Sequence, residues 1–171
     1  MLLRLVAVGC LALALGACGG DGGEADSASS TATTSNLPQG CDPAAVKGAI
    51  DGFLAAITAG NRARILRSLS PEPDFERLTI ADPDGVFRTT SRTRAADYLA
   101  ARHAHGENER LLQAIVNPGA DAGHAVVQFT IVRTAADFPA RDIHNRAAIG
   151  EATINCLTQR IARWRLATGR A

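Results

Sequence analysis

Residues 19–40 limit what this 171-residue chain can fold into more than any other segment. They read GGDGGEADSASSTATTSNLPQG, and Leu37 is the only large apolar residue among them. Folding needs buried apolar surface to offset the loss of conformational entropy, so this segment cannot supply a core. It predicts a flexible linker with a root-mean-square span of roughly 25 Å. A folded domain is therefore expected only from Cys41 to about Thr168.

A short apolar run with a charged start precedes the linker. Arg4 is followed by apolar residues 5–15, which are too few for a membrane-spanning helix of about 20 residues but suit an export signal. The run ends in Leu15-Gly16-Ala17-Cys18, which resembles the lipobox of bacterial lipoproteins. The resemblance implies that residues 1–17 are a signal peptide, and that Cys18 then carries diacylglycerol and palmitate at the start of the linker, 18–40.

This interpretation predicts a protein held at the cell membrane by its lipid, on the extracytoplasmic side. It does not choose between the inner and the outer membrane of a cell that has two. The alternative for Cys18 is a free cysteine at the end of an ordinary secretory signal.

The charge balance argues against a nucleic-acid partner. Lys and Arg total 18 and Asp and Glu total 17, so the formal net charge is +1. A protein with so small a net charge has no overall attraction for nucleic acid or anionic lipid, and export also argues against nucleic acid. The sequence also has no Gly-rich phosphate loop, no Cys-x-x-Cys and no Gly-x-Ser-x-Gly, so neither a cofactor nor a metal is predicted. His103 and His105 stand two residues apart, whereas a zinc pair on a helix needs a spacing of four.

Three helices are expected in the first half of the domain. Asp42-Pro43 is an N-cap followed by proline at the first helical position, and apolar residues then recur at helical spacing as far as Gly60. Asn61 caps a second helix that stops before Pro71. Thr93 is the expected cap of a third helix, which runs to about residue 103.

The remaining segments predict strands. Residues 124–133, HAVVQFTIVR, alternate most clearly, and shorter strands are expected at 75–80, 86–90, 110–116, 152–156 and 160–167. Helices first and hairpin-connected strands afterwards indicate an α+β domain, with the helices on one face of an antiparallel sheet.

This order of elements resembles the NTF2-like (SnoaL-like, cystatin-like) superfamily. The residues that carry the resemblance are Phe53 to Asn61 at the junction of the first two helices, the apolar face Ile65-Leu66 and Leu69, and the third helix at 94–103. The resemblance implies a cone over residues 41–168, with three helices packed on a curved antiparallel sheet. Residues 102–111 and 135–138 also resemble uncharacterised actinobacterial secreted proteins, which bring no known activity.

Cys41 and Cys156 are the cysteines expected in the exported domain, and they predict a disulfide. Closing so long a loop contributes roughly 4–5 kcal/mol at most by chain-entropy arithmetic. The alternative is two separate buried thiols.

Two residues are weak candidates for catalysis. Asp82 lies in Thr79-Ile80-Ala81-Asp82-Pro83, which resembles the Thr-Val-Glu-Asp-Pro stretch of bacterial ketosteroid isomerases, whose Asp is a general base. Two departures weaken the likeness: the spacing from Gly60 is about five residues too long, and Leu69 replaces an aromatic donor. An Asp-Pro-Asp-Gly turn explains the same residues without chemistry. His103 is the other titratable side chain that could face inward, but a lone base needs a positioned partner.

Two functional hypotheses remain from the sequence. The favoured one is a lipid-anchored, non-catalytic domain that binds a small apolar ligand or a cell-surface protein, with a homodimer as a further possible assembly. The alternative is an isomerase, dehydratase or cyclase that acts on a small apolar substrate. The interior of the cone distinguishes them, and its candidate lining is aromatic: Phe53, Tyr98, Phe129 and Trp164.

Overall fold

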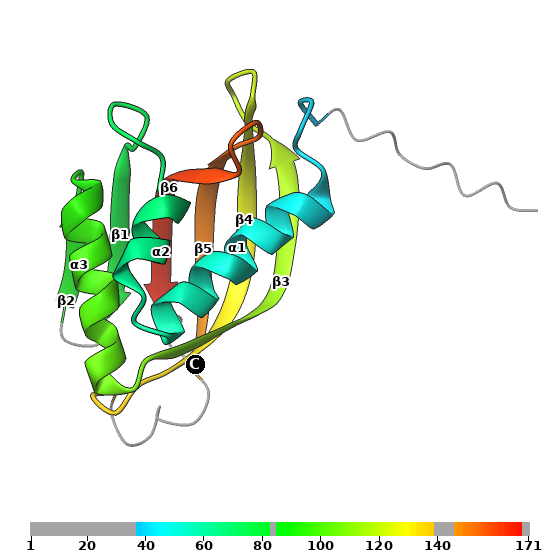
Figure 1. Cartoon of the computed structure of the whole chain (residues 1–171). Coiled ribbons are helices and arrows are strands. Elements are labelled where there is room, and N and C mark those ends of the chain that lie inside the picture. Colours follow the sequence, from blue (N-terminus) through cyan, green and yellow to red (C-terminus); the bar gives the residue numbers. More distant parts are fainter. Residues whose placement is uncertain (1–36, 83–84, 139–145, 169–171) are drawn as a thin grey trace, which may run out of the picture. The chain divides into compact units, whose positions relative to one another are not determined.

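Three helices lie against one face of a six-stranded sheet in the computed structural model, which describes residues 37–82, 85–138 and 146–168 (Figure 1). The helices are α1 (Pro43–Thr58), α2 (Arg62–Ser68) and α3 (Arg92–Arg102), and a 3-10 turn, η1 (His103–His105), follows α3. The strands are β1 (Arg77–Asp82), β2 (Gly85–Thr89), β3 (Asn108–Pro118), β4 (His124–Thr134), β5 (Arg146–Asn155) and β6 (Arg160–Thr168). The α+β class with helices preceding most of the sheet is thus confirmed.

Side-chain caps set where the helices begin. Asp42 caps α1 by accepting a hydrogen bond of 3.0 Å from the backbone of Ala45, and Asn61 caps α2 in the same way. The cap of α3 is Ser91 and not Thr93, so this helix begins two residues earlier than the sequence predicted. Both residue types cap helices well, and only the backbone path at Ser91 decides between them.

The strand order is β2-β1-β6-β5-β4-β3, which makes β2 and β3 the edges of an open, curved sheet (Figure 1). Four neighbouring pairs are antiparallel, but β1 and β6 run parallel, from Arg77 opposite Arg163 to Ile80 opposite Leu166. The sheet is therefore mixed at this one pair.

The strand β5 begins at Arg146 and not at Ala152, where the sequence predicted it. The small residues at its start show little alternation in hydrophobicity, so the sequence pattern missed them.

The core lies between α1 and the inner face of the sheet. Phe53 of α1 packs edge-on against Trp164 of β6, with ring centroids 5.0 Å apart. Phe129 of β4 stacks on the same Trp164 at 4.4 Å. All three side chains are buried, so aromatic rings occupy the centre of the domain.

A disulfide joins Cys41, just before α1, to Cys156, just after β5, with the Cα atoms 4.7 Å apart. The predicted pairing is present in the structure, and both residues are buried. Cys18 and the rest of residues 1–36 lie outside the described part of the chain.

The chain divides into two units, Met1–Thr34 and Ser35–Ala171. The aromatic core and the disulfide belong entirely to the second unit, so residues 35–171 are expected to fold without the first. No helix among the described residues is long and apolar enough to cross a membrane.

Candidate functional site

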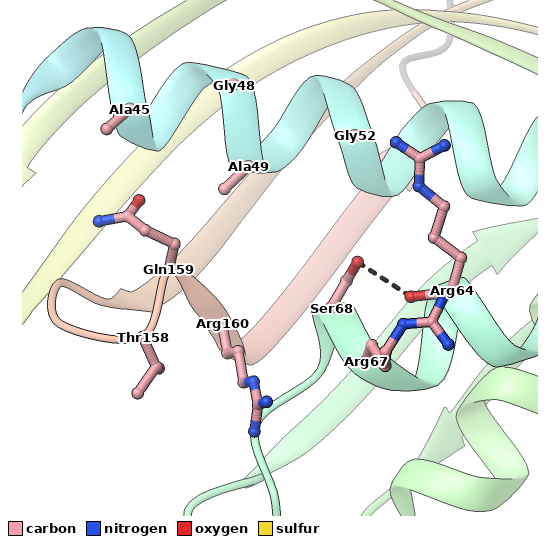
Figure 2. Close-up of a pocket in the computed structure, with 10 residues that line it drawn as sticks. All are labelled: Ala45, Gly48, Ala49, Gly52, Arg64, Arg67, Ser68, Thr158, Gln159 and Arg160. Carbon is pink, nitrogen blue, oxygen red and sulfur yellow. Dashed lines mark hydrogen bonds between the residues drawn. The ribbon is translucent and has the colours of Figure 1, made fainter.

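A groove of about 380 Å³ follows α1 where α2 and the turn between β5 and β6 approach it (Figure 2). Its floor is a face of α1 made of small residues at helical spacing: Ala45, Gly48, Ala49 and Gly52. A Cβ added to Gly48 would meet no other atom within 4 Å, so the middle of this floor is open.

The opposite face of α1 holds this floor in place. Val46, Ile50 and Phe53 are completely buried against the sheet. Because rotating the helix would expose these side chains to water, the small face stays directed outward.

One wall of the groove is α2. Ile65 is completely buried and fixes this short helix against the core. Arg64 and Arg67, three residues apart and both exposed, are therefore neighbours on its outer surface. Ser68, which also lines the groove, donates a hydrogen bond of 3.1 Å to the carbonyl oxygen of Arg64.

The other wall is formed by the turn that connects β5 to β6, which carries Gln159, and by Arg160 at the start of β6. Gln159 adopts a left-handed conformation, with φ at 55°. Its Nε2 donates to the carbonyl oxygens of Gly40 (2.7 Å) and Cys156 (2.6 Å), which fixes the orientation of the amide. Its Oε1 is shielded from solvent and has no hydrogen-bond partner among the described residues.

The groove is positively charged. Of the described residues that line it, three are arginines and none is acidic. Within the described part of the chain, Arg64, Arg67 and Arg160 form no ion pair. By contrast, Arg62 is paired with Asp97 on the nearby surface. A groove of this kind is suited to an anionic ligand, since guanidinium groups donate charge-assisted hydrogen bonds to carboxylate and phosphate.

A second group of charged side chains lies where η1, β3 and β4 meet, and all of its members except Asp137 are buried. We call it the ionic cluster: Arg102, Glu107, Glu109, Arg133 and Asp137. Arg133 donates to Glu107 at 2.8 Å and lies 3.0 Å from Glu109. Arg102 also donates to Glu107 at 2.8 Å and bonds both carboxylate oxygens of Asp137. The buried ring of Phe138 lies 5.3 Å from the Arg133 guanidinium.

Glu109 is a buried carboxyl group of this cluster with a raised pKa. Burial, together with the neighbouring Glu107, raises the pKa of Glu109 to about 8, although Arg133 opposes the shift. The hydrogen bonds from Arg102 lower the pKa of Asp137. The raised pKa of Glu109 favours its protonated form, and the lowered pKa of Asp137 favours its carboxylate. Oε2 of Glu109 has no hydrogen-bond partner among the described residues.

The residues that the sequence proposed for an interior site do not form one group. Phe53, Phe129 and Trp164 contact one another at the centre of the domain. Tyr98 lies on α3 and stacks on Phe87 of β2, with centroids 3.8 Å apart. The four rings are engaged with other rings and not arranged around a common pocket.

The two catalytic candidates also lie apart. The ring of His103 is held by a hydrogen bond from Nδ1 to the carbonyl oxygen of Thr58, at 2.8 Å, and it packs against Gly60. Those contacts join the ends of α1 and α3, which is a structural role. Asp82 ends β1, opposite Gly85, and its side chain lies outside the described residues.

Neither the groove nor the ionic cluster was found from the sequence. The small face of α1 was visible as Ala and Gly at spacings of three and four, but nothing in the sequence showed which arginines face it. Glu107 and Glu109 lie close after the third predicted helix, where polar residues are usually solvated, but they are buried at the start of β3. No group of three His, Cys, Asp or Glu side chains that could hold a metal ion occurs among the described residues.

No protein-family model matches the chain, and no curated protein matches it either. Solved structures with the same fold do match. A candidate calcium/calmodulin-dependent protein kinase II association domain from Xanthomonas campestris is 17% identical, with a TM-score of 0.58 over 78% of this chain and 91% of that one.

An NTF2-like protein from Streptomyces avermitilis, named as a candidate dehydratase, is 13% identical, with a TM-score of 0.57 over 75% of this chain and 96% of that one. A protein of unknown function with a cystatin-like fold from Nostoc punctiforme is 9% identical, with a TM-score of 0.55 over 79% of this chain and 96% of that one. These likenesses show that the fold is the NTF2-like cone expected from the sequence. At such low identity they say nothing about function.

Proposed function

We propose that this protein is a non-catalytic binding domain, held at the extracytoplasmic side of the cell membrane by a lipid on Cys18, and that it binds an anionic ligand or partner. The proposal replaces the small apolar ligand expected from the sequence. Aromatic rings fill the centre of the domain, whereas the groove along α1 is open and basic.

The observation that carries this proposal is the arrangement of charge around the groove. Arg64 and Arg67 stand on one side and Arg160 on the other, over a floor without large side chains (Figure 2). Arginines clustered without acids repel one another, and a bound anion relieves that repulsion.

The proposed location is supported by two features of the chain. The apolar run and Leu15-Gly16-Ala17-Cys18 have the form of a lipoprotein signal. The Cys41–Cys156 disulfide suits an oxidising compartment outside the cytoplasm.

Anion binding is tested with residues 35–171 and two polymeric probes, polyphosphate and poly-L-glutamate. The variant Arg64→Gln/Arg67→Gln/Arg160→Gln should lose at least about tenfold in affinity, as expected when several charge-assisted contacts are removed. The matched control, Arg77→Gln/Arg94→Gln/Arg110→Gln, removes the same charge from exposed positions elsewhere. Absence of binding to both probes, or equal losses in the two variants, would refute the proposal.

The anchor is tested in the full chain by Cys18→Ser. The variant should leave the membrane fraction or accumulate with its signal uncleaved, because the thiol that accepts the lipid is missing. A Cys18→Ser protein that is processed and sediments with membranes like the wild type contradicts the lipoprotein interpretation.

The alternative function, an isomerase, dehydratase or cyclase, is favoured by one observation. Glu109 is a buried carboxyl group whose pKa is raised to about 8, which favours the protonated form that a general acid needs. Its side chain is only 2% exposed, however, so a substrate would need a route to it. Turnover of a small substrate that is lost in Glu109→Gln, with stability retained, would establish this function in place of the first.

A further inference from the structure

We propose that the ligand of the groove is a linear phosphodiester polymer whose linking units carry hydroxyl groups, that is, a polyol phosphate. This inference rests on the proposed function and specifies the chemistry of its anion. It draws on three features: the spread of the charges, the lack of apolar lining, and the unpaired acceptor of Gln159.

The positive charges at the groove are separated from one another. Figure 2 shows the guanidinium groups of Arg64, Arg67 and Arg160 at separate points around it, not gathered on one point. The floor from Ala45 to Gly52 covers seven helical steps, or about 10 Å. One small anion cannot contact guanidinium groups at all of these separate points. A chain with a negative charge on each unit can, and each further contact is then intramolecular.

The described lining contains no large apolar side chain that could hold an apolar group of a ligand. None of its ten residues has an apolar side chain larger than a methyl group. Peptide ligands are usually held by buried aromatic or aliphatic anchors, and this groove has no place for one. The phosphates of such a ligand can bond the arginines, and its hydroxyl groups can donate to the oxygens of Ser68 and Thr158. The protons of these two side chains are already donated to Arg64 and Asn155.

The wall of the groove also contains an acceptor that no described residue satisfies. The two hydrogen bonds from Nε2 of Gln159 fix its amide, so that Oε1 is left without a donor. Figure 2 shows this amide facing α1. An unsatisfied buried acceptor is costly, and a hydroxyl group of the ligand could reach it after a small movement of the turn. Simple polyphosphate, which has no hydroxyl groups along its chain, could not.

The test compares ligands of different chemistry on residues 35–171. Poly(glycerol phosphate) should bind at least about tenfold more tightly than poly-L-glutamate or polyphosphate of similar length, and much more tightly than glycerol 3-phosphate. Equal affinity for the three polymers would overturn this inference and leave the anion-binding function standing. Equal affinity for the polymer and the monomer would also overturn it.

A steric variant identifies the site. Gly48→Leu fills the floor without changing the charge, and it meets open space, so the fold should be unaffected. It should lower the affinity for poly(glycerol phosphate) at least about tenfold. The control Ala44→Leu, exposed on the same helix but outside the groove, should not. Unchanged binding by Gly48→Leu refutes the inference.

Vesicles containing phosphatidylglycerol present the same phosphate and hydroxyl chemistry as a lipid headgroup. They should bind less tightly than the polymer, because a membrane surface cannot enter the groove along its length. Vesicles that bind more tightly than the polymer, and in an arginine-dependent manner, would overturn the polymer assignment in favour of a headgroup.

Discussion

The ring of Phe129 lies directly over Gly150, its partner in the register between β4 and β5. A Cβ at position 150 would overlap Cζ and Cε2 of that ring, and it would lie 2.8 Å from the carbonyl oxygen of Arg165. The glycine therefore makes room for the aromatic core. Without it, Phe129 could not stack on Trp164.

Gly150→Ala should destabilise the domain by about 1–3 kcal/mol, the usual cost of overpacking a filled core. The matched control is Gly48→Ala, which meets open space on a helix and should stabilise by about 0.5–1 kcal/mol. Chemical denaturation of both variants measures the difference. A Gly150→Ala protein as stable as the wild type would mean that Phe129 does not occupy this position.

The stability of the domain should fall as the pH rises from about 4.5 to 8. The pKa of Glu109 is raised to about 8 in the folded protein, so the folded state binds more protons than the unfolded state in that window. One proton corresponds to a slope of at most about 1.4 kcal/mol per pH unit.

Glu109→Gln should remove this contribution. The free energy of unfolding of the variant, relative to that of the wild type, should therefore be higher at pH 8 than at pH 5. Thermal unfolding across the pH range tests it, with Glu72→Gln, an exposed residue, as the control. Parallel pH profiles for wild type and Glu109→Gln would contradict the raised pKa.

His103→Ala should destabilise the domain by about 1 kcal/mol, because it removes one hydrogen bond to Thr58 and the contact with Gly60. It should leave anion binding unchanged, since His103 is not part of the groove. His105→Ala, at the end of the same turn, is the control and should have a smaller effect. Loss of binding without loss of stability in His103→Ala would assign this histidine a functional role.

Removing the disulfide should lower stability by about 2–5 kcal/mol. It ties the start of α1 to the end of β5, next to the turn that forms one wall of the groove. Denaturation of the wild type with and without reductant measures the effect. The double variant Cys41→Ala/Cys156→Ala should be as unstable as the reduced wild type and should not respond to reductant.

The sequence alone predicted the elements whose signals are local. Asp42-Pro43 and Asn61 gave the starts of two helices, because a cap satisfies backbone groups within one turn. The alternation in 124–133 gave β4, because successive side chains point to opposite faces of a sheet. Two cysteines in an exported domain were enough to predict their disulfide.

Only the tertiary structure decided what depends on contacts between distant segments. The parallel pairing of β1 with β6 has no local signal in the sequence of either strand. The acids at 107 and 109 are buried because β4 brings Arg133 beside them, and no local pattern separates a paired buried carboxylate from a solvated one. Likewise, Arg160 lies at the same groove as Arg64 and Arg67, although more than ninety residues separate them in the sequence. They line one groove because α1, α2 and the β5–β6 turn pack on the same core.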